Sequence, residues 1–188
     1  GHIFNGHCRN AHAKCVRGDP LLPPQPDELP PGYSAFLGPA NAKLTIIVAM
    51  QLDYWWFKVR PTLDQLMSAY PIRFELHIYV VTNRHHDSAH ALCAAARSGR
   101  LVDFERRILA AGYDKSRDPA VLRGAALDSG IKPADFDRDV IACAHQVAQD
   151  GEAMVNRGAT VTPTFFIGKR EISGAQTYGA FEAVIKAE

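Results

Sequence analysis

Residues 162–185 read TPTFFIGKREISGAQTYGAFEAVI, and this stretch decides the fold. The apolar run at 164–167 and the shorter run at 171–173 flank a Gly-Lys-Arg turn, which predicts two strands joined in a hairpin. Residues 177–186 predict a helix that buries the apolar side chains Tyr178, Phe181, Val184 and Ile185. Pro163 has no N–H to donate to a strand ladder, so it belongs at the start or the edge of the first strand.

Two more strands are predicted earlier in the chain. Residues 44–50, LTIIVAM, are apolar on both faces, which is typical of a strand in the middle of a sheet. Residues 72–81, IRFELHIYVV, predict the second strand. Between them, apolar residues recur at i, i+3, i+4 and i+7, which predicts a helix closed by Pro71 with the stripe Leu63, Leu66, Met67 and Tyr70. Strand, helix and strand in this order predict a parallel pair with a right-handed crossover.

Residues 87–157 have helical spacing throughout. Caps, prolines and glycines divide them into four predicted helices. These run from Asp87 or Ser88 to near Gly99, from 101 to 111, from Asp118 to near Gly130, and from Pro133 to before Gly158. We expect the fourth to be broken once, with Phe136, Val140, Ile141, Val147 and Val155 as candidate core positions.

The predicted order is that of an α/β thioredoxin fold with an inserted all-helical domain. The chain also resembles the DsbA-like thiol-disulfide oxidoreductases over roughly residues 38–187. Residues 162–185 are similar to the closing segment of that family, and residues 38–54, GPANAKLTIIVAMQLDY, are similar to the stretch that leads into its active site. Residues 61–70, PTLDQLMSAY, and the His86-Asp87 pair fit as well.

The chain is expected to divide into an arm and two folded parts. Residues 33–86 and 158–188 would form the thioredoxin-like domain, and residues 87–157 the helical insertion. Residues 1–32 would be an extended arm or linker, because prolines fix φ and lack an N–H. These prolines are Pro20, Pro23, Pro24, Pro26, Pro30 and Pro31.

The resemblance implies that the Thr162-Pro163 peptide bond is cis and that the backbone of Thr162 faces the active site. An X-Pro bond is the only one in which cis costs as little as about 0.5 to 1 kcal/mol. A cis bond at Pro163 would leave the backbone of residue 162 unpaired and free to bind an extended peptide by strand addition.

The family's chemistry needs Cys-x-x-Cys at the start of the helix after the first strand, where the helix dipole lowers the pKa of one thiol. In this chain residues 53–61 read DYWWFKVRP, without a cysteine. This turn is also about three residues shorter than the family pattern. Thiol-disulfide catalysis by the usual route is therefore not expected, and we assign no catalytic residue.

Aromatic side chains take the place of the dithiol: Tyr54, Trp55, Trp56 and Phe57. Aromatics beside a preformed groove are suited to burying the side chains of a partner. We therefore predict a peptide-binding site formed by these four residues with Thr162 and Pro163. The alternative is that the aromatics fill the volume of the shortened turn and cover the core.

The four cysteines allow two bridges. Some DsbA-like proteins have a bridge at positions similar to Cys93 and Cys143, so the resemblance implies a structural disulfide between these two; the alternative is a pair of buried free thiols. Cys8 and Cys15 would close a short loop in the arm, which suits an oxidising compartment. Neither pair has redox spacing.

Two groups of histidines are weaker candidates for metal ligands. His7 and His12 together with Cys8 and Cys15 suit zinc or copper, but their spacing matches no established zinc pattern. His86 and His90 lie four residues apart at a predicted helix start, where a solvated first turn is the simpler interpretation. We expect no metal and no other cofactor. Glu105, Arg106 and Arg107 are interpreted as a solvated face.

Charge and composition exclude some partners. The 21 basic and 20 acidic residues give a formal net charge of +1 without a basic stripe, which argues against nucleic acid. The longest apolar run, residues 44–50, is too short to span a bilayer. We expect a periplasmic or secreted protein whose signal peptide has been removed, with a protein or peptide partner. The sequence predicts nothing about oligomeric state.

The function predicted from the sequence is that of a redox-inactive, DsbA-like thioredoxin-fold protein, which acts as a binding or assembly module through the groove at Pro163. One alternative is an enzyme of the same architecture without the dithiol. Glutathione transferases of the kappa class resemble this plan, but they use a serine in the turn, and residues 53–61 hold none. The other alternative is a metal-handling protein that uses the arm.

Overall fold

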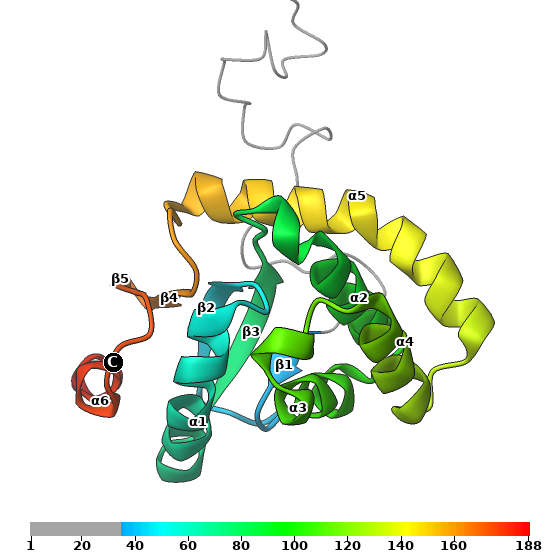
Figure 1. Ribbon diagram of the computed structural model, residues 1–188. Coiled ribbons are helices and arrows are strands. Elements are labelled where there is room, and N and C mark those ends of the chain that lie inside the picture. Colours follow the sequence, from blue (N-terminus) through cyan, green and yellow to red (C-terminus); the bar gives the residue numbers. More distant parts are fainter. Residues whose placement is uncertain (1–34) are drawn as a thin grey trace, which may run out of the picture.

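A computed structural model describes residues 35–188, which form a five-stranded sheet with helices on both faces (Figure 1). The strands are β1 (Phe36–Leu37), β2 (Leu44–Met50), β3 (Ile72–Ile78), β4 (Thr164–Ile167) and β5 (Arg170–Ser173). The helices are α1 (Tyr54–Ala69), α2 (His86–Arg97), α3 (Leu101–Ala111), α4 (Pro119–Asp128), α5 (Pro133–Arg157) and α6 (Tyr178–Lys186). Two short 3₁₀ helices are η1 (Asn83–His85) and η2 (Tyr113–Lys115).

The strand order is β1-β3-β2-β4-β5. Strands β2 and β3 are parallel and in register from Leu44 beside Ile72 to Met50 beside Ile78, as the strand-helix-strand order predicts. The other neighbours in the sheet pair antiparallel, and β4 and β5 form the expected hairpin. The predicted thioredoxin fold is confirmed.

Both faces of the sheet are buried because successive side chains of a strand point to opposite faces. On one face, Val48 and Phe74 join the main core with α1, α6 and α2–α4. On the other face, Ile47 and Phe166 pack against Met154 of α5 in a smaller cluster. Figure 1 shows α5 crossing the top of the molecule, over the sheet and along α2. None of the helices within residues 35–188 combines the length and apolarity needed to span a membrane.

A disulfide joins Cys93 of α2 to Cys143 of α5 with a Cα–Cα distance of 5.9 Å. Both cysteines are fully buried. The bridge fixes α5 along α2, and it is the pair that the family resemblance implies. Cys8 and Cys15 lie outside the described residues, as does the rest of the predicted arm.

Several predicted boundaries were wrong. Helix α5 is continuous from 133 to 157 instead of broken, and its positions Ile141 and Val155 are exposed, Ile141 to 79%. Phe136 and Val147 are buried as expected, because they face α2 and α4. Strand β3 ends at Ile78 instead of residue 81, and η1 begins at Asn83. The short edge strand β1 was not expected.

A buried polar cluster lies between β3 and α5. His77 Nδ1 is 3.0 Å from Asp150 Oδ1, and His77 Nε2 is 3.3 Å from Glu75 Oε1. Burial alone would lower the pKa of His77, but the hydrogen bonds to Asp150 and Glu75 and the charges of both carboxylates raise it to about 9. The ring is therefore protonated at neutral pH. Its ion pair with Asp150 ties the sheet to α5, and its ion pair with Glu75 lies within β3.

The raised pKa of His77 makes the stability of the fold depend on pH. Its protonated ring is the form that both carboxylates bind, so its contribution is complete below 6.5 and is lost as pH rises toward 9. We expect the free energy of unfolding, measured by urea titration at a series of pH values, to fall between pH 6.5 and about 9. In His77→Gln this dependence of the free energy on pH should be weaker. Burial lowers the pKa values of His85 and His90, so both titrate below the window. A constant free energy in the unmodified chain would contradict this account.

Candidate functional site

Asp53 caps the start of α1 at the end of the central strand. Its backbone is extended, with φ −99° and ψ 178°, and its Oδ1 accepts a hydrogen bond of 2.9 Å from the Trp56 amide. This is the usual geometry of an N-cap, which satisfies an amide left without a partner at a helix start. The sequence did not decide whether residues 53–61 form a helix start. In the structure residues 54–61 are already helix, and Pro61 lies inside α1.

The second carboxylate oxygen of Asp53 anchors a buried network. Asp53 Oδ2 accepts hydrogen bonds from Thr162 Oγ1 at 2.7 Å and from Gln51 Nε2 at 3.0 Å. The same Gln51 nitrogen also lies 3.1 Å from Thr162 Oγ1, and Gln51 Oε1 accepts from the Val81 amide at 3.1 Å. The network joins the chain after β2, the chain after β3 and the chain before β4. It holds the three segments together at one end of the sheet.

The chemistry of this position is that of an acceptor, not of a nucleophile. Asp53 stands at the start of the helix after the central strand, in the stretch 53–61 where the family resemblance places the dithiol. A carboxylate cannot form the mixed disulfide that thiol exchange requires. The two cysteines within the described part of the chain, Cys93 and Cys143, are both in the buried bridge.

Trp56 belongs to the core, so its prediction as a peptide-binding residue was wrong. Its side chain has no exposed surface, and its Nε1 donates a 2.8 Å hydrogen bond to Glu105 Oε2 on α3. Arg60 Nε lies 2.9 Å from the same oxygen, and Arg60 also pairs with Asp64 one turn later. Glu105 is therefore buried between α1 and α3 instead of solvated, because two donors of α1 pair with it. Arg106 is exposed, as expected.

The other aromatic side chains form a row in which Tyr54 and Trp55 are exposed and Phe57 and Tyr113 are half-buried. Tyr54 and Trp55 are 48% and 52% exposed, and their rings meet edge to face with centroids 5.2 Å apart. Tyr113 of η2 extends the row, with its centroid 6.0 Å from Tyr54 and 5.8 Å from Phe57. We call Tyr54, Trp55, Phe57 and Tyr113 the aromatic surface. Sequence reasoning missed Tyr113, because nothing in the local pattern shows that η2 folds against the start of α1.

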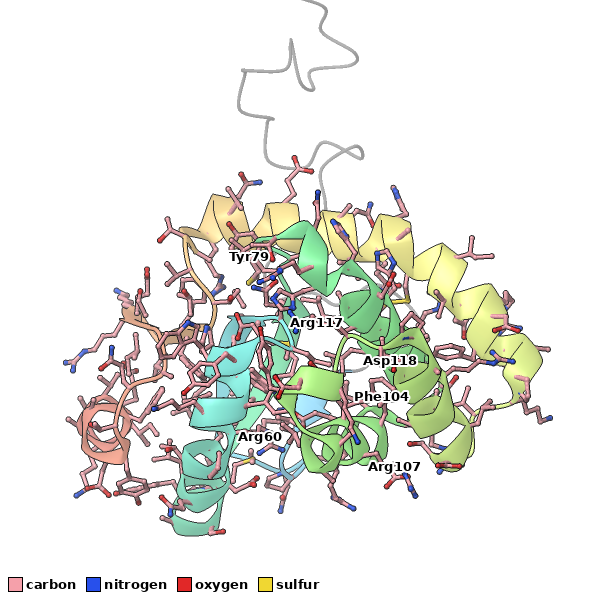
Figure 2. The ribbon with its side chains drawn as sticks, viewed as in Figure 1. Arg60, Tyr79, Phe104, Arg107, Arg117 and Asp118 are labelled. Carbon is pink, nitrogen blue, oxygen red and sulfur yellow. A yellow bond between two sulfur atoms is a disulfide. The ribbon has the colours of Figure 1, made fainter. Side chains whose placement is uncertain are left out.

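Cations flank the aromatic surface. Lys58 Nζ lies 5.9 Å from the ring centroid of Tyr54, and the Arg117 guanidinium lies 5.0 Å from that of Tyr113. Figure 2 shows Arg117 near the middle of the molecule, between η2 and the start of α2. His85 of η1 is buried, and its Nδ1 has no hydrogen-bond partner within residues 35–188. Burial lowers the pKa of His85, although the nearby carboxylate of Asp53 opposes that effect.

Thr162 and Pro163 lie directly before β4, at the same end of the sheet as Asp53. The peptide bond between them is cis, and both side chains are buried. Among residues 35–188 no backbone group pairs with the amide or the carbonyl of Thr162. Two exposed apolar side chains, Val81 and Val161, stand beside the network.

The second pair of candidate metal ligands lies on α2. The rings of His86 and His90 are 5.7 Å apart between centroids. Within the described residues, no third histidine, cysteine or carboxylate joins them in a metal-binding group. His7, Cys8, His12 and Cys15 lie outside the described residues.

Comparisons with known proteins agree with this architecture. The family model described as DSBA-like thioredoxin domain matches residues 39–186. A thioredoxin-like oxidoreductase from Silicibacter pomeroyi is similar in structure with a TM-score of 0.72 and 19% identity, over 84% of this chain and 92% of that chain. A periplasmic thioredoxin-like protein from Salmonella enterica serovar Typhimurium has a TM-score of 0.69 and 17% identity, over 83% of this chain and 90% of that chain. The catalytic domain of Proteus mirabilis ScsC has a TM-score of 0.63 and 17% sequence identity, over 82% of this chain and 88% of that chain. No curated protein matches the sequence.

Replacing Asp53 tests whether its network holds the site together. Asp53→Ala removes the helix cap and leaves the hydroxyl of Thr162 and the amide of Gln51 without their shared acceptor. We expect a loss of about 2–4 kcal/mol in the free energy of unfolding. Asp53→Asn should lose less, because its side-chain oxygen still caps the helix. The matched control is Asp114→Ala, an exposed acid on η2. Equal losses in Asp53→Ala and Asp114→Ala would refute the role of the network.

Proposed function

Because this chain belongs to the family of DSBA-like thioredoxin domains, we propose that it is a member without dithiol chemistry, which binds an extended segment of another protein at the end of the sheet that carries Asp53. Its role is that of a binding or assembly module. The partner contacts the backbone of the Thr162-Pro163 loop on one side and the aromatic surface on the other.

One observation carries the proposal: the helix start holds a carboxylate with both oxygens in use. Asp53 accepts hydrogen bonds from the Trp56 backbone amide, the Thr162 hydroxyl and the Gln51 side-chain amide. A nucleophile at this place would need a free, reactive atom. This position instead stabilises the loop that a peptide would contact, so the geometry favours binding over catalysis.

The contacts open to a peptide suit an extended backbone with apolar side chains. The backbone of Thr162, which pairs with no backbone group of residues 35–188, offers one donor and one acceptor for strand addition. Val81 and Val161 are exposed beside it, and Tyr54 and Trp55 are exposed at the start of α1. Large aromatics on a rigid helix are suited to be the anchors of an interface, because they bury much area at little entropic cost.

We also propose that the protein works in the periplasm or outside the cell. The buried Cys93–Cys143 bridge suits an oxidising compartment. The similar thioredoxin-like protein from Salmonella enterica serovar Typhimurium is described as periplasmic.

Binding of an unfolded protein tests this function. The probe is fluorescently labelled, reduced and carboxymethylated α-lactalbumin, which is extended and has no thiol to exchange. We expect the full chain to bind it in an anisotropy titration. Trp55→Ala should weaken binding by about 5- to 30-fold, since loss of an aromatic anchor costs roughly 1–2 kcal/mol.

The matched control for Trp55→Ala is Ile141→Ala, which removes an even more exposed apolar side chain from α5. This variant should bind like the unmodified chain. Equal weakening in both variants would mean that the probe adheres to exposed apolar side chains in general, and the proposed site would be wrong.

A further inference from the structure

Helix α5 presents an apolar stripe to solvent along its outward face. The members of this α5 stripe alternate at spacings of three and four residues, which is typical of paired helices: Ile141, Ala144, Ala148, Gly151 and Val155. Ile141 and Val155 are 79% and 50% exposed, Ala144 and Ala148 are exposed and Gly151 is half-buried. Single exposed apolar side chains are common on protein surfaces, but these five are aligned on one helix face over about 21 Å.

The inward face of the same helix is held by the rest of the fold. Cys143 is joined to Cys93 by the disulfide, and Asp150 pairs with His77 of the sheet. Both anchors lie on the side of the helix opposite Ala148. Figure 1 shows α5 along the outer edge of the fold. The α5 stripe is therefore presented by a rigid helix, so little conformational freedom is lost when another surface packs on it.

A hollow of about 210 Å³ lies beside the α5 stripe. All members of the stripe except Ile141 line it on one side, and Tyr79, Val80 and His90 line it on another. Ile141 is the most exposed of the large apolar side chains in the described residues. The stripe thus has a projecting side chain at one end and a hollow along the rest of its length, which makes the surface complementary to itself.

A second copy of the chain fits this surface when its α5 runs antiparallel to the first. Ile141 and Val155 each lie seven positions from Ala148. A two-fold axis at Ala148 therefore brings Ile141 of one copy against Val155 of the other, at the rim of the hollow. The small side chains of Ala144 and Ala148, together with Gly151, allow the two helix axes to approach to about 8 Å.

Charged groups beside the α5 stripe favour the antiparallel direction. His145 and Glu152 are exposed on the same flank of α5. In the antiparallel pair His145 of each copy faces Glu152 of the other, and an imidazole N–H can donate to that carboxylate. In a parallel pair each of these residues would face its own counterpart, which places two carboxylates together. Complementary contacts of this kind select one arrangement over the other.

We propose that the α5 stripe is the interface of a homodimer, in which two copies pack antiparallel across a two-fold axis at Ala148. Such an interface uses the same surface of both copies and closes as a dimer. It contains only part of one helix and its surroundings, so we expect a dissociation constant in the micromolar range. None of its residues belongs to the peptide site proposed above, so this inference does not depend on the proposed function.

Sedimentation velocity of the full chain tests the interface. We expect a change from monomer to dimer between about 1 µM and a few hundred µM. Ala148→Glu places like charges at the two-fold axis and should weaken the association about tenfold or more. Its circular dichroism should match that of the unmodified chain, because residue 148 is exposed.

The matched control is Ala142→Glu, the same change at an exposed position of α5 outside the stripe. It should associate like the unmodified chain. The proposal would be wrong if the unmodified chain stays monomeric over the whole range, or if Ala148→Glu associates as strongly as the control.

A mixture of two variants identifies the partner surface. Ala148→Lys alone should also remain monomeric where the unmodified chain dimerises. An equimolar mixture of Ala148→Glu and Ala148→Lys should dimerise again, because opposite charges then meet at the axis. If the mixture stays monomeric, the α5 stripe packs against a different surface and the two-fold interface is refuted.

The double variant Ile141→Glu/Val155→Lys tests the direction of packing. In the antiparallel dimer each introduced carboxylate faces an introduced ammonium group, at both ends of the interface. We therefore expect the double variant to associate about tenfold more tightly than Ile141→Glu alone. In a parallel dimer like charges would meet instead, so equal or weaker association of the double variant would overturn the antiparallel arrangement.

Discussion

The carboxylate of Asp53 is the contact on which the rest of the site depends. One oxygen caps the start of α1 by accepting a hydrogen bond from the Trp56 backbone amide. The other accepts hydrogen bonds from the Thr162 hydroxyl and the Gln51 side-chain amide. Three segments are joined here, the loop before β4 through Asp53 and the chain after β3 through Gln51, whose Oε1 accepts from the Val81 amide. Because a buried carboxylate is stable only when its oxygens are satisfied, the arrangement is mutually dependent: the helix start, the loop before β4 and the chain after β3 hold one another in place.

The position of Asp53 also decides which aromatic side chains are exposed. Successive residues of a helix point about 100° apart. With the helix fixed to begin at Tyr54, Tyr54 and Trp55 face solvent and Trp56 turns into the core, where Glu105 accepts its N–H. The sequence left two alternatives open for the aromatics, a binding surface or a filled core. The structure buries Trp56 and leaves Tyr54 and Trp55 exposed, so exposure and packing are divided between neighbouring residues of one turn.

Much of the fold could be predicted because its signals are local. The apolar strands, the hairpin after Pro163 and the Asp118 cap of α4 each depend on a few adjacent residues. The predicted cap of α2 at Asp87 or Ser88 was wrong, because the helix already begins at His86 and has no side-chain cap. The start of α1 was left undecided because 53–61 was compared with a family turn, although Asp53 before an apolar run is itself a capping signal. Glu105 and Tyr113 could not be placed from sequence, because their partners Arg60 and Tyr54 lie on another helix and no local pattern encodes how two helices meet. The continuity of α5 likewise depends on its packing along α2.

We propose that the helix start carries a carboxylate with both oxygens hydrogen-bonded in place of the thiols of the family. The most direct measurement is the reduction of insulin by dithiothreitol with and without the full chain, beside the same measurement on Asp53→Ala. The account predicts the uncatalysed rate in every case, because neither chain has a reactive thiol at this site and the Cys93–Cys143 bridge is buried. Turnover above the uncatalysed rate would contradict it and would mean that one of the four cysteines is catalytic.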